Sequence, residues 1–261
     1  MSNGILYVVA TPIGNLQDFS PRAKLILSQV DLIAAEDTRH SGYLLKHFGI
    51  VTPLKSLHEY NEKQQAETLL HRLLNGDNIA LISDAGTPLI SDPGQFFLQL
   101  VLAEQITVVP IPGASALITA LSVAGLPANQ FVFEGFLPAK TNTRQQRLEL
   151  LKTETRTLVF YEAPHRILAC IKAMLQVFGE QREIVLIKEL TKIFETIYRN
   201  DLLSTFNWLQ AEPKRSKGEF VLVVKGYLPP DNKLITPEAE RIFKLLRKDL
   251  PLKQAAKLTS E

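Results

Sequence analysis

The sequence predicts an α/β protein of two domains followed by a short helical segment. Short apolar runs alternate with helical stretches along most of the chain, which is typical of a mainly parallel sheet covered by helices. The composition shifts after Gly125, where Leu-Pro-Ala-Asn interrupts the pattern. The length of 261 residues fits two modest domains, and the hydrophobic share of 46% is ordinary for a folded chain.

The first domain is expected to span residues 1–125. Strands are predicted where a short apolar run ends at polar residues, as ILYVVA does at Thr11-Pro12. Ser20 followed by Pro21 predicts a capped helix start. The expected strands are 5–10, 31–36, 78–83 and 106–109, and the expected helices are 21–30, 38–48, 62–75, 94–103 and 114–123.

The second domain is expected to span residues 130–227. Its predicted strands are 131–136, 157–161, 183–188 and 219–224, and its predicted helices are 143–152, 167–178 and 201–211. A second linker rich in proline covers 227–231. One helix beginning near Pro237 and another after Pro251 predict a C-terminal helical segment over 233–261.

Composition excludes several classes of protein. The single cysteine, Cys170, excludes an internal disulfide framework and a cysteine-cluster zinc site. The five histidines form no His-x3-His or His-Glu-x-x-His pair, so no metal is expected. No apolar run approaches the roughly 18–20 residues of a membrane span, and the N-terminus lacks the charged start of a signal peptide. We therefore expect a cytoplasmic protein with no membrane partner.

The net charge of +2 is unevenly distributed. Residues 1–130 carry 7 basic and 11 acidic side chains, whereas residues 131–261 carry 22 and 16. The excess of positive charge in the second half is compatible with a polyanionic partner, although it does not require one.

Four polar loops rich in Gly, Pro and acidic residues follow the predicted strands of the first domain, at 11–18, 36–39, 83–94 and 110–116. Ligands of open α/β sheets bind outside the carboxyl ends of the strands, so these loops outline a ligand site. Neither a GxGxxG nor a Walker A pattern is present, which disfavours a dinucleotide or ATP. Tight turns and helix capping are the simpler interpretation of most of these residues, but Asp84, directly after a strand, favours contact with a ligand hydroxyl.

Six motifs at and beyond these loops make the sequence recognisable: VATPIGNL, AEDTR, SDAGTPLISDPG, PIPGASA, YEAPHR and KELTK. In this order they resemble the ribosomal RNA small subunit methyltransferase I family, part of the wider tetrapyrrole methylase-like group. The resemblance implies two α/β domains of the tetrapyrrole methylase type with a cofactor cleft between them. It also implies S-adenosylmethionine-dependent methylation of the ribose 2′-hydroxyl of a cytidine in 16S rRNA of the small ribosomal subunit.

The resemblance also assigns the cofactor-binding residues. Asp84 matches the carboxylate that contacts the cofactor, and Ser115 with Ala116 matches a small pair lying against it. The full expected set is Pro12, Ser83, Asp84, Ala85, Thr87, Ser115, Ala116, Glu162, Ala163 and Leu190.

Methyl transfer to a ribose hydroxyl requires alignment of oxygen, carbon and sulfur, and a group that accepts the hydroxyl proton. Lys188 and Glu189 end a predicted strand at the expected cleft, and either could assist this proton transfer. Glu36 and Asp37 are the rival pair. A salt-linked strand end is the simpler interpretation of Lys188 and Glu189.

Polar and basic residues near the expected cleft are the predicted RNA contacts: Asn15, Arg39, His165, Arg166, Lys192, Lys214, Arg215 and Lys217. Arg166 offers a bidentate fork suited to phosphate, although Pro164 also fits a simple helix start. The resemblance implies a homodimer whose partner is 16S rRNA within the small subunit. It further implies additional helices after 233–261, so this segment is expected to be incomplete.

Two alternatives stay open at the level of the residues. The first is a tetrapyrrole (small-molecule) methylase, and the second is a non-catalytic ribosome-associated RNA-binding protein that kept the fold. The basic second half and the AEDTR block favour RNA over a tetrapyrrole. Binding of S-adenosylmethionine would separate an enzyme from a binding module.

Overall fold

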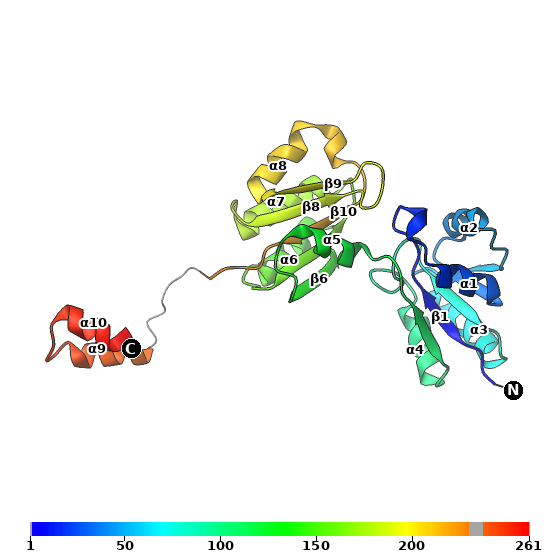
Figure 1. Cartoon of the computed structure of the whole chain (residues 1–261), viewed down its shortest axis with the longest axis horizontal. Coiled ribbons are helices and arrows are strands. Elements are labelled where there is room, and N and C mark those ends of the chain that lie inside the picture. Colours follow the sequence, from blue (N-terminus) through cyan, green and yellow to red (C-terminus); the bar gives the residue numbers. More distant parts are fainter. Residues whose placement is uncertain (1, 230–236, 261) are drawn as a thin grey trace. The chain divides into compact units, whose positions relative to one another are not determined.

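The computed structural model describes residues 2–229 and 237–260, whose elements are labelled in Figure 1. The strands are β1 (Leu6–Val9), β2 (Leu32–Ala35), β3 (Leu54–Ser56), β4 (Ile79–Ile82), β5 (Val108–Ile111), β6 (Phe131–Phe136), β7 (Thr157–Glu162), β8 (Glu183–Lys188), β9 (Thr196–Asp201) and β10 (Phe220–Val224). The α-helices are α1 (Pro21–Gln29), α2 (Thr38–His47), α3 (Glu62–Leu74), α4 (Gln95–Ala103), α5 (Ala116–Ala124), α6 (Thr141–Leu151), α7 (Ile167–Phe178), α8 (Leu202–Ala211), α9 (Pro237–Leu246) and α10 (Leu252–Ser260). Two short 3-10 helices are η1 (Leu16–Asp18) and η2 (Pro213–Ser216).

The first sheet is parallel, with strand order β3-β2-β4-β1-β5. Every residue of β2 and β4 is buried, as expected for inner strands of a parallel sheet covered on both faces. Because all five strands run in one direction, their carboxyl ends share one edge of the sheet. The loops after β1, β2 and β4 therefore meet at that edge, where ligands of such sheets bind.

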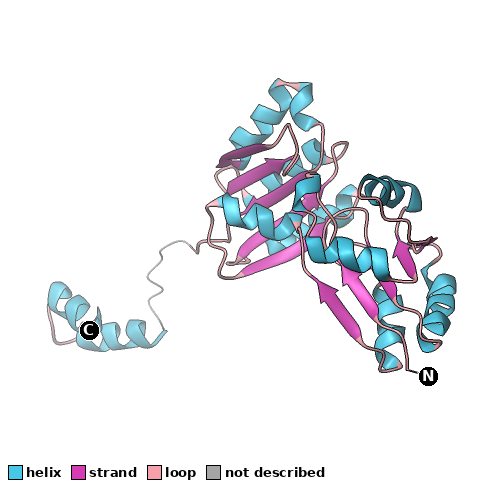
Figure 2. Cartoon of the chain, turned by 45° about the vertical axis from the view of Figure 1, so that its right-hand side comes forward, coloured by secondary structure: helices cyan, strands magenta, loops and turns pink. Residues whose placement is uncertain are grey.

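Helices cover both faces of this sheet (Figure 2). On one face, α3 and α4 bury Leu69, Leu73 and Phe97 against β1, β2 and β4. On the other, α1 and α2 bury Leu27 and Leu45. The α/β fold predicted from the alternation of strands and helices is confirmed.

The second sheet has strand order β6-β7-β10-β8-β9. Only β6 and β7 are parallel, while β10 runs antiparallel to both β7 and β8, and β8 and β9 form an antiparallel hairpin. Helices α6, α7 and α8 cover one face through Leu148, Ile171 and Leu209. The opposite face of the second sheet is covered by a different helix.

Helix α5 supplies that cover. It follows the first sheet in the chain but packs on the second, where Leu117, Leu121 and Ala124 contact Val185 and Val223; Figure 1 shows it against these strands. The guanidinium of Arg199 on β9 donates to the last carbonyls of α5, those of Val123 and Ala124. Through α5, a segment that follows the first sheet in the chain completes the hydrophobic core of the second sheet.

Two strands were not predicted from the sequence, β3 and β9. Both lie at sheet edges and neither is fully buried, so they lack the apolar run that marked the inner strands. In β9 the residues TIYRND pair with β8 through backbone hydrogen bonds that leave no signal in hydrophobicity. The predicted helix at 143–152 begins two residues earlier, at Thr141.

The second compact unit begins at Tyr227. Its helices α9 and α10 pack on each other, and Ala255 is fully buried. The predicted break at Leu250-Pro251 separates the two helices as expected from the proline. Residues 233–236 and 261 of the predicted segment lie outside the described residues.

Within residues 2–229 and 237–260, no helix has the length and apolar character that a bilayer crossing demands. The longest, α3, has 13 residues.

Replacing Gly135 by alanine is expected to destabilise the fold. Gly135 has φ +62°, and an added Cβ would lie 2.9 Å from Ser91 Oγ. A left-handed alanine costs about 1–2 kcal/mol, and displacing Ser91 adds to that cost. Gly49→Ala is the matched control, because Gly49 has φ +69° and nothing within 4 Å of an added Cβ. Denaturant unfolding should show a larger loss for Gly135→Ala, whereas equal losses would show that Ser91 moves aside freely.

Candidate functional site

A cavity of about 470 Å³ lies at the carboxyl edge of the first sheet, facing the second sheet. Its volume is in the range of small-molecule sites. The first-sheet side is lined by Ile13, Glu36, Asp84, Ala85, Gly86, Thr87, Ile90, Ser91, Asp92, Ser115 and Ala116. The second-sheet side is lined by Phe136, Tyr161, Glu162, Ala163, Pro164, Ile187, Leu190, Glu219, Phe220 and Val221.

The loop after β4 forms much of this wall and is held in an unusual conformation. Leu89 and Ser91 have φ of 74° and 72°, although neither is glycine. Gly86 pairs with Thr11 in an antiparallel bridge, and the Thr87 hydroxyl donates to the Ala114 carbonyl at 3.1 Å. Such strained conformations persist only where the surroundings hold them, and they concentrate at functional sites.

Three carboxylates from two loops gather at the cavity. Glu36 directly follows β2, Asp84 follows β4, and Asp92 lies later in the same loop as Asp84. Burial, followed by the charge of Asp84, raises the pKa of Glu36. Burial also raises the pKa of Asp92 to about 6, and the nearby charges of Glu36 and Asp84 add to the effect. Carboxylates crowded in this way favour a ligand that carries positive charge or donates hydrogen bonds.

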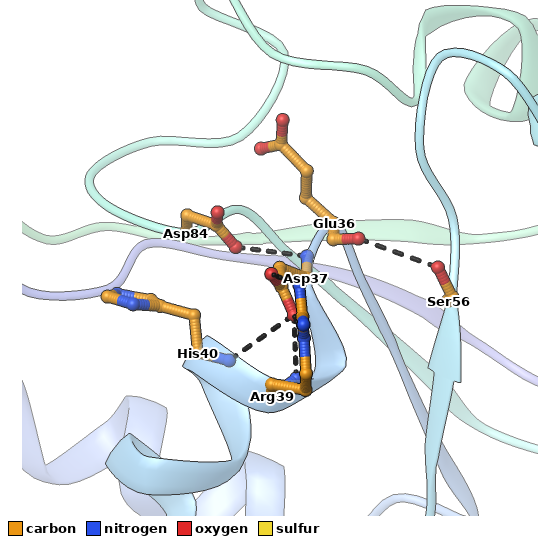
Figure 3. A network of polar contacts seen from close by, with 6 residues as sticks. All are labelled: Glu36, Asp37, Arg39, His40, Ser56 and Asp84. Carbon is orange, nitrogen blue, oxygen red and sulfur yellow. Dashed lines mark hydrogen bonds and ion pairs between the residues drawn. The ribbon is translucent and has the colours of Figure 1, made fainter.

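Asp37 makes hydrogen bonds that hold the backbone beside these three carboxylates (Figure 3). Its main-chain N–H donates to Asp84 Oδ1 at 3.0 Å, and its side chain caps α2 by accepting from the N–H groups of Arg39 and His40. The Arg39 side chain pairs with the same carboxylate at 3.0 Å and lowers the pKa of Asp37 to about 2. The exposed Asp37 carboxylate therefore orients the loop and leaves the cavity to Glu36 and Asp84.

The N-terminus of α5 also lines the cavity, through Ser115 and Ala116. Tyr161 Oη accepts the Leu117 N–H at 3.1 Å, and burial raises the pKa of this phenol. The N-cap residue Ser115 makes no side-chain cap. The positive end of the α5 dipole therefore lies at the cavity wall, where it suits an anionic group.

The turn after β8 positions Leu190 on the wall. Glu189 has φ 53°, and its carboxylate accepts from the Glu219 N–H at 2.9 Å and from Lys192 Nζ at 3.1 Å. Lys192 also pairs with Glu219 at 2.8 Å. Lys188 Nζ donates to the Lys214 carbonyl at 2.9 Å.

Glu162 reaches the cavity through its main chain, because its side chain is completely buried on the other face of the sheet. There its carboxylate pairs with Arg166 Nε at 3.2 Å and accepts the N–H of Ala163 at 2.9 Å. Arg166 also donates to the Leu137 carbonyl. These contacts fix the turn from Tyr161 to Arg166 at the edge of the cavity.

Most of the predicted cofactor residues meet in this cavity: Asp84, Ala85, Thr87, Ser115, Ala116, Glu162, Ala163 and Leu190 line it. Pro12 and Ser83 are buried beside it, next to the lining residues Ile13 and Asp84. Of the four proposed catalytic residues, Glu36 lines the cavity, whereas Asp37, Lys188 and Glu189 do not.

The predicted RNA contacts divide into two groups. Asn15, Arg39, His165, Lys214 and Lys217 are exposed, and Asn15 also caps η1. The others are held in the fold: Arg166 pairs with Glu162, Lys192 pairs with Glu189 and Glu219, and Arg215 lies over the Trp208 ring and pairs with Glu212.

Several lining residues were not predicted, above all Asp92 and Tyr161. Asp92 lies in the SDAGTPLISDPG motif, eight residues after Asp84, and its acidic side chain could have been paired with Asp84. Tyr161 and Phe136 stand in apolar strands, where an aromatic residue indicates core unless the cavity is known. Phe136 and Tyr161 contact each other edge-on, with ring centroids 5.7 Å apart.

The cavity has the chemistry of a site for S-adenosylmethionine. Within the described part of the chain, no Lys or Arg lines it, while Glu36, Asp84 and Asp92 do. These acids suit the sulfonium and amino cations, the α5 N-terminus suits the carboxylate, and the apolar wall suits the adenine ring. Over residues 2–229 and 237–260, no cluster of three or more His, Cys, Asp or Glu residues could hold a metal.

Comparison with solved structures shows which known proteins share this fold. Uroporphyrin-III C-methyl transferase from Thermus thermophilus, complexed with S-adenyl homocysteine, superposes with a TM-score of 0.60 at 14% identity over 85% of this chain and 97% of that chain. A diphthine synthase gives a TM-score of 0.63 at 13% identity over 87% and 92%. The family described as Tetrapyrrole (Corrin/Porphyrin) Methylases matches residues 5–204. The fold is thus that of the tetrapyrrole methylase family.

Comparison with proteins of similar sequence identifies the family within this class. The chain is 52% identical to ribosomal RNA small subunit methyltransferase I of Haemophilus influenzae over 99% of this chain and 92% of the relative. It is 52% identical to the protein of the same name from Pseudomonas aeruginosa over 100% and 93%. The chain belongs to the ribosomal RNA small subunit methyltransferase I family.

Arg166→Ala is expected to destabilise the protein strongly, because it leaves the Glu162 carboxylate buried without its cation. Breaking a buried pair in this way costs about 3–5 kcal/mol. Arg39→Ala is the control, since its Asp37 pair is exposed and its loss should change stability little. The free energy of unfolding from denaturant titration measures both. Equal, small losses would mean that Glu162 finds another cation in its place.

Proposed function

We propose that this chain methylates the 2′-hydroxyl of a cytidine ribose in 16S rRNA of the small ribosomal subunit, with S-adenosylmethionine as methyl donor. The observation that carries the proposal is the acidic, partly apolar cavity at the strand ends of a chain that shares 52% identity with ribosomal RNA small subunit methyltransferase I. Family membership supports the methyltransferase activity and the cofactor. The exact nucleoside and the 2′-hydroxyl come from the resemblance of the motifs.

The cofactor supplies an electrophilic methyl group when bound. Asp84 and Asp92 would attract its cations, and the α5 N-terminus at Ser115 and Ala116 would receive its carboxylate. Ala85, Thr87, Ala163 and Leu190 would shape the remaining wall. Pro12 and Ser83 support this wall from behind.

Glu36 is the residue that we assign to the hydroxyl proton. It lines the cavity and is half-buried, and its raised pKa makes its carboxylate a stronger base than an exposed glutamate. As the ribose oxygen attacks, its proton would pass to a Glu36 carboxylate oxygen. The other three candidates act indirectly in this proposal, because they hold the turns beside the cavity: Lys188, Glu189 and Asp37.

The substrate would approach over the exposed cations. Arg39 lies three residues after Glu36, in the first turn of α2, and its side chain is 88% exposed. Lys214 lies in η2 and Lys217 directly after it, shortly before the lining residue Glu219. These side chains, with His165, are the proposed phosphate contacts. A homodimer and a cytoplasmic location, where ribosomal subunits are found, complete the proposal.

The alternative of a tetrapyrrole (small-molecule) methylase fits less well. The structural neighbours with tetrapyrrole-linked names are 13–17% identical to the chain, which supports the shared fold alone. A non-catalytic RNA-binding protein would not need a cavity that suits a charged cofactor.

Transfer of label from S-adenosylmethionine tests the function directly. Small ribosomal subunits and naked 16S rRNA from cells lacking the enzyme would be incubated with the protein and methyl-labelled cofactor. Nuclease digestion and nucleoside chromatography should then find the label in 2′-O-methylcytidine. Label in a base, in another nucleoside or in no RNA would contradict the proposal.

Cofactor affinity is expected to depend on pH through Asp92. Because the pKa of Asp92 is about 6 in the free protein, the carboxylate is ionised above this pH and becomes neutral below it. Affinity for the cationic cofactor should therefore be constant above about pH 7 and fall as the pH drops through 6. Calorimetric titration across pH 5–8 measures this effect.

Asp92→Asn should weaken binding at neutral pH by roughly ten- to a hundred-fold, the loss of one charge-assisted hydrogen bond, and flatten the pH dependence. Glu67→Gln, on the exposed side of α3, is the matched control and should behave as the parent. If Asp92→Asn keeps both the affinity and its pH dependence, Asp92 does not contact the cofactor.

A further inference from the structure

Helix α2 begins at the edge of the cavity and carries a set of exposed basic residues. Its N-cap, Asp37, directly follows the lining residue Glu36, and the Asp37 N–H donates to Asp84 Oδ1 at 3.0 Å (Figure 3). The first turn of α2 is thereby anchored to the acidic wall. The exposed residues of this helix are Arg39, His40, Tyr43, Lys46 and His47.

These five residues lie on one face of α2. Tyr43 is separated from the other four by three or four positions, which is the spacing of side chains on one side of a helix. Ser41 and Leu45 are buried on the opposite side, where Leu45 packs in the core of the first sheet. The basic residues and the tyrosine ring therefore form one continuous surface, which we call the α2 face.

The α2 face lies in a part of the fold that holds no carboxylate of its own. Neither α1 nor α2 contains Asp or Glu, although residues 1–130 carry 7 basic and 11 acidic side chains. Lys24 of α1 adds a cation beside the end of α2, with Nζ 4.1 Å from the centroid of the Phe48 ring. Helix α3, on the other face of the sheet, mixes both signs, as solvated helices usually do. Positive charge is thus concentrated where α1 and α2 cover the sheet.

Helix stability does not account for this arrangement. Lys46 and His47 lie in the last turn of α2, where the helix dipole favours them. Arg39 and His40 lie in the first turn, where the dipole disfavours positive charge. Between the two ends, Tyr43 is 78% exposed and gains little from burial. The first turn and the tyrosine therefore call for a partner outside the helix.

Single-stranded RNA has the chemistry that fits this face. Proteins bind it by stacking unpaired bases on aromatic rings and by placing cations against the backbone phosphates. Arg39 and Lys46 stand on either side of Tyr43, roughly 10 Å apart along the helix axis at 1.5 Å per residue. A base stacked on Tyr43 would have cations on both sides for the phosphates that flank it.

We propose that the α2 face holds the single-stranded RNA next to the target nucleotide, with Tyr43 stacking on a base and Arg39 and Lys46 contacting phosphates. The inference rests on the proposed function. Because α2 begins directly beyond Glu36, RNA on this face is continuous with a ribose placed at the cavity. The side chains of the α2 face touch none of the reacting atoms and act as positioning residues for the substrate.

Affinity for a short, fluorescein-labelled, single-stranded oligoribonucleotide tests the stacking contact. Tyr43→Ala should weaken binding in fluorescence anisotropy by about five- to a hundred-fold, as expected for the loss of one stacked base. Tyr43→Phe keeps the ring and should bind as the parent does. A duplex of the same sequence hides its bases, so its affinity should not change in Tyr43→Ala. With small ribosomal subunits as substrate, Tyr43→Ala should raise KM and leave kcat near the parent value.

The salt dependence of binding separates phosphate contacts from stacking. For single strands, the slope of log affinity against log salt concentration falls by about 0.7 for each phosphate contact that is lost. Lys46→Ala should therefore flatten the slope by about this amount, whereas Tyr43→Ala should keep the slope of the parent.

Matched controls come from exposed residues elsewhere on the first sheet. Tyr60→Ala removes a ring that is 93% exposed beside Glu59, and Lys63→Ala removes an exposed cation of α3. Both should keep the affinity and the salt slope of the parent. Calorimetric affinity for S-adenosylmethionine and the sedimentation coefficient, measured for every variant, should match the parent and show that folding and oligomeric state are unchanged.

The outcomes separate the inference from the function on which it rests. If the parent protein forms no 2′-O-methylcytidine, the proposed function fails. If the parent is active and Tyr43→Ala and Lys46→Ala keep its RNA affinity, salt slope and KM, the inference is overturned. It is also overturned if Tyr43→Phe loses as much affinity as Tyr43→Ala, or if Tyr43→Ala changes the oligomeric state, because the face then belongs to a contact between two copies of the chain.

Discussion

The packing of α5 on the second sheet is the contact on which the rest of the site depends. This helix leaves the last strand of one sheet and buries Leu117 and Leu121 against the other, so that the carboxyl edge of the first sheet faces β7, β8 and β10. The hydrogen bond from Leu117 N–H to Tyr161 sets one end of α5 at the cavity, and Arg199 holds the other end. Without this cover, the apolar face formed by Val185 and Val223 would be exposed, and the cavity would have one wall.

Electrostatic repulsion is the second constraint. Glu36, Asp84 and Asp92 meet at one cavity wall, where burial and the neighbouring negative charges raise the pKa values of Glu36 and Asp92. A cationic ligand relieves this repulsion, whereas a neutral one of the same shape does not. The same acids would repel RNA phosphates, and the exposed cations Arg39, Lys214 and Lys217 lie outside the cavity wall.

The sequence predicted what depends on local pattern. Inner strands such as β2 and β4 are apolar runs, the Ser20 cap precedes its helix, and the loop with Asp84 follows a buried strand. Features that depend on distant partners were not visible: the edge strands β3 and β9, the path of α5 onto the other sheet, and the contribution of Tyr161 from an apolar strand. The sequence also did not show which way a side chain points. Glu162 was predicted to bind the cofactor, yet its carboxylate pairs with Arg166.

The position of Cys170 gives the second sheet and its helices a reporter of their own. This thiol is the sole cysteine of the chain and is fully buried on α7. Burial, followed by the charge of the adjacent Glu162, raises its pKa well above the ordinary value, so the native thiol is both shielded and protonated. Alkylating reagents attack thiolates in contact with solvent. The rate at which such a reagent labels the protein therefore measures how often the layer of helices behind the second sheet opens.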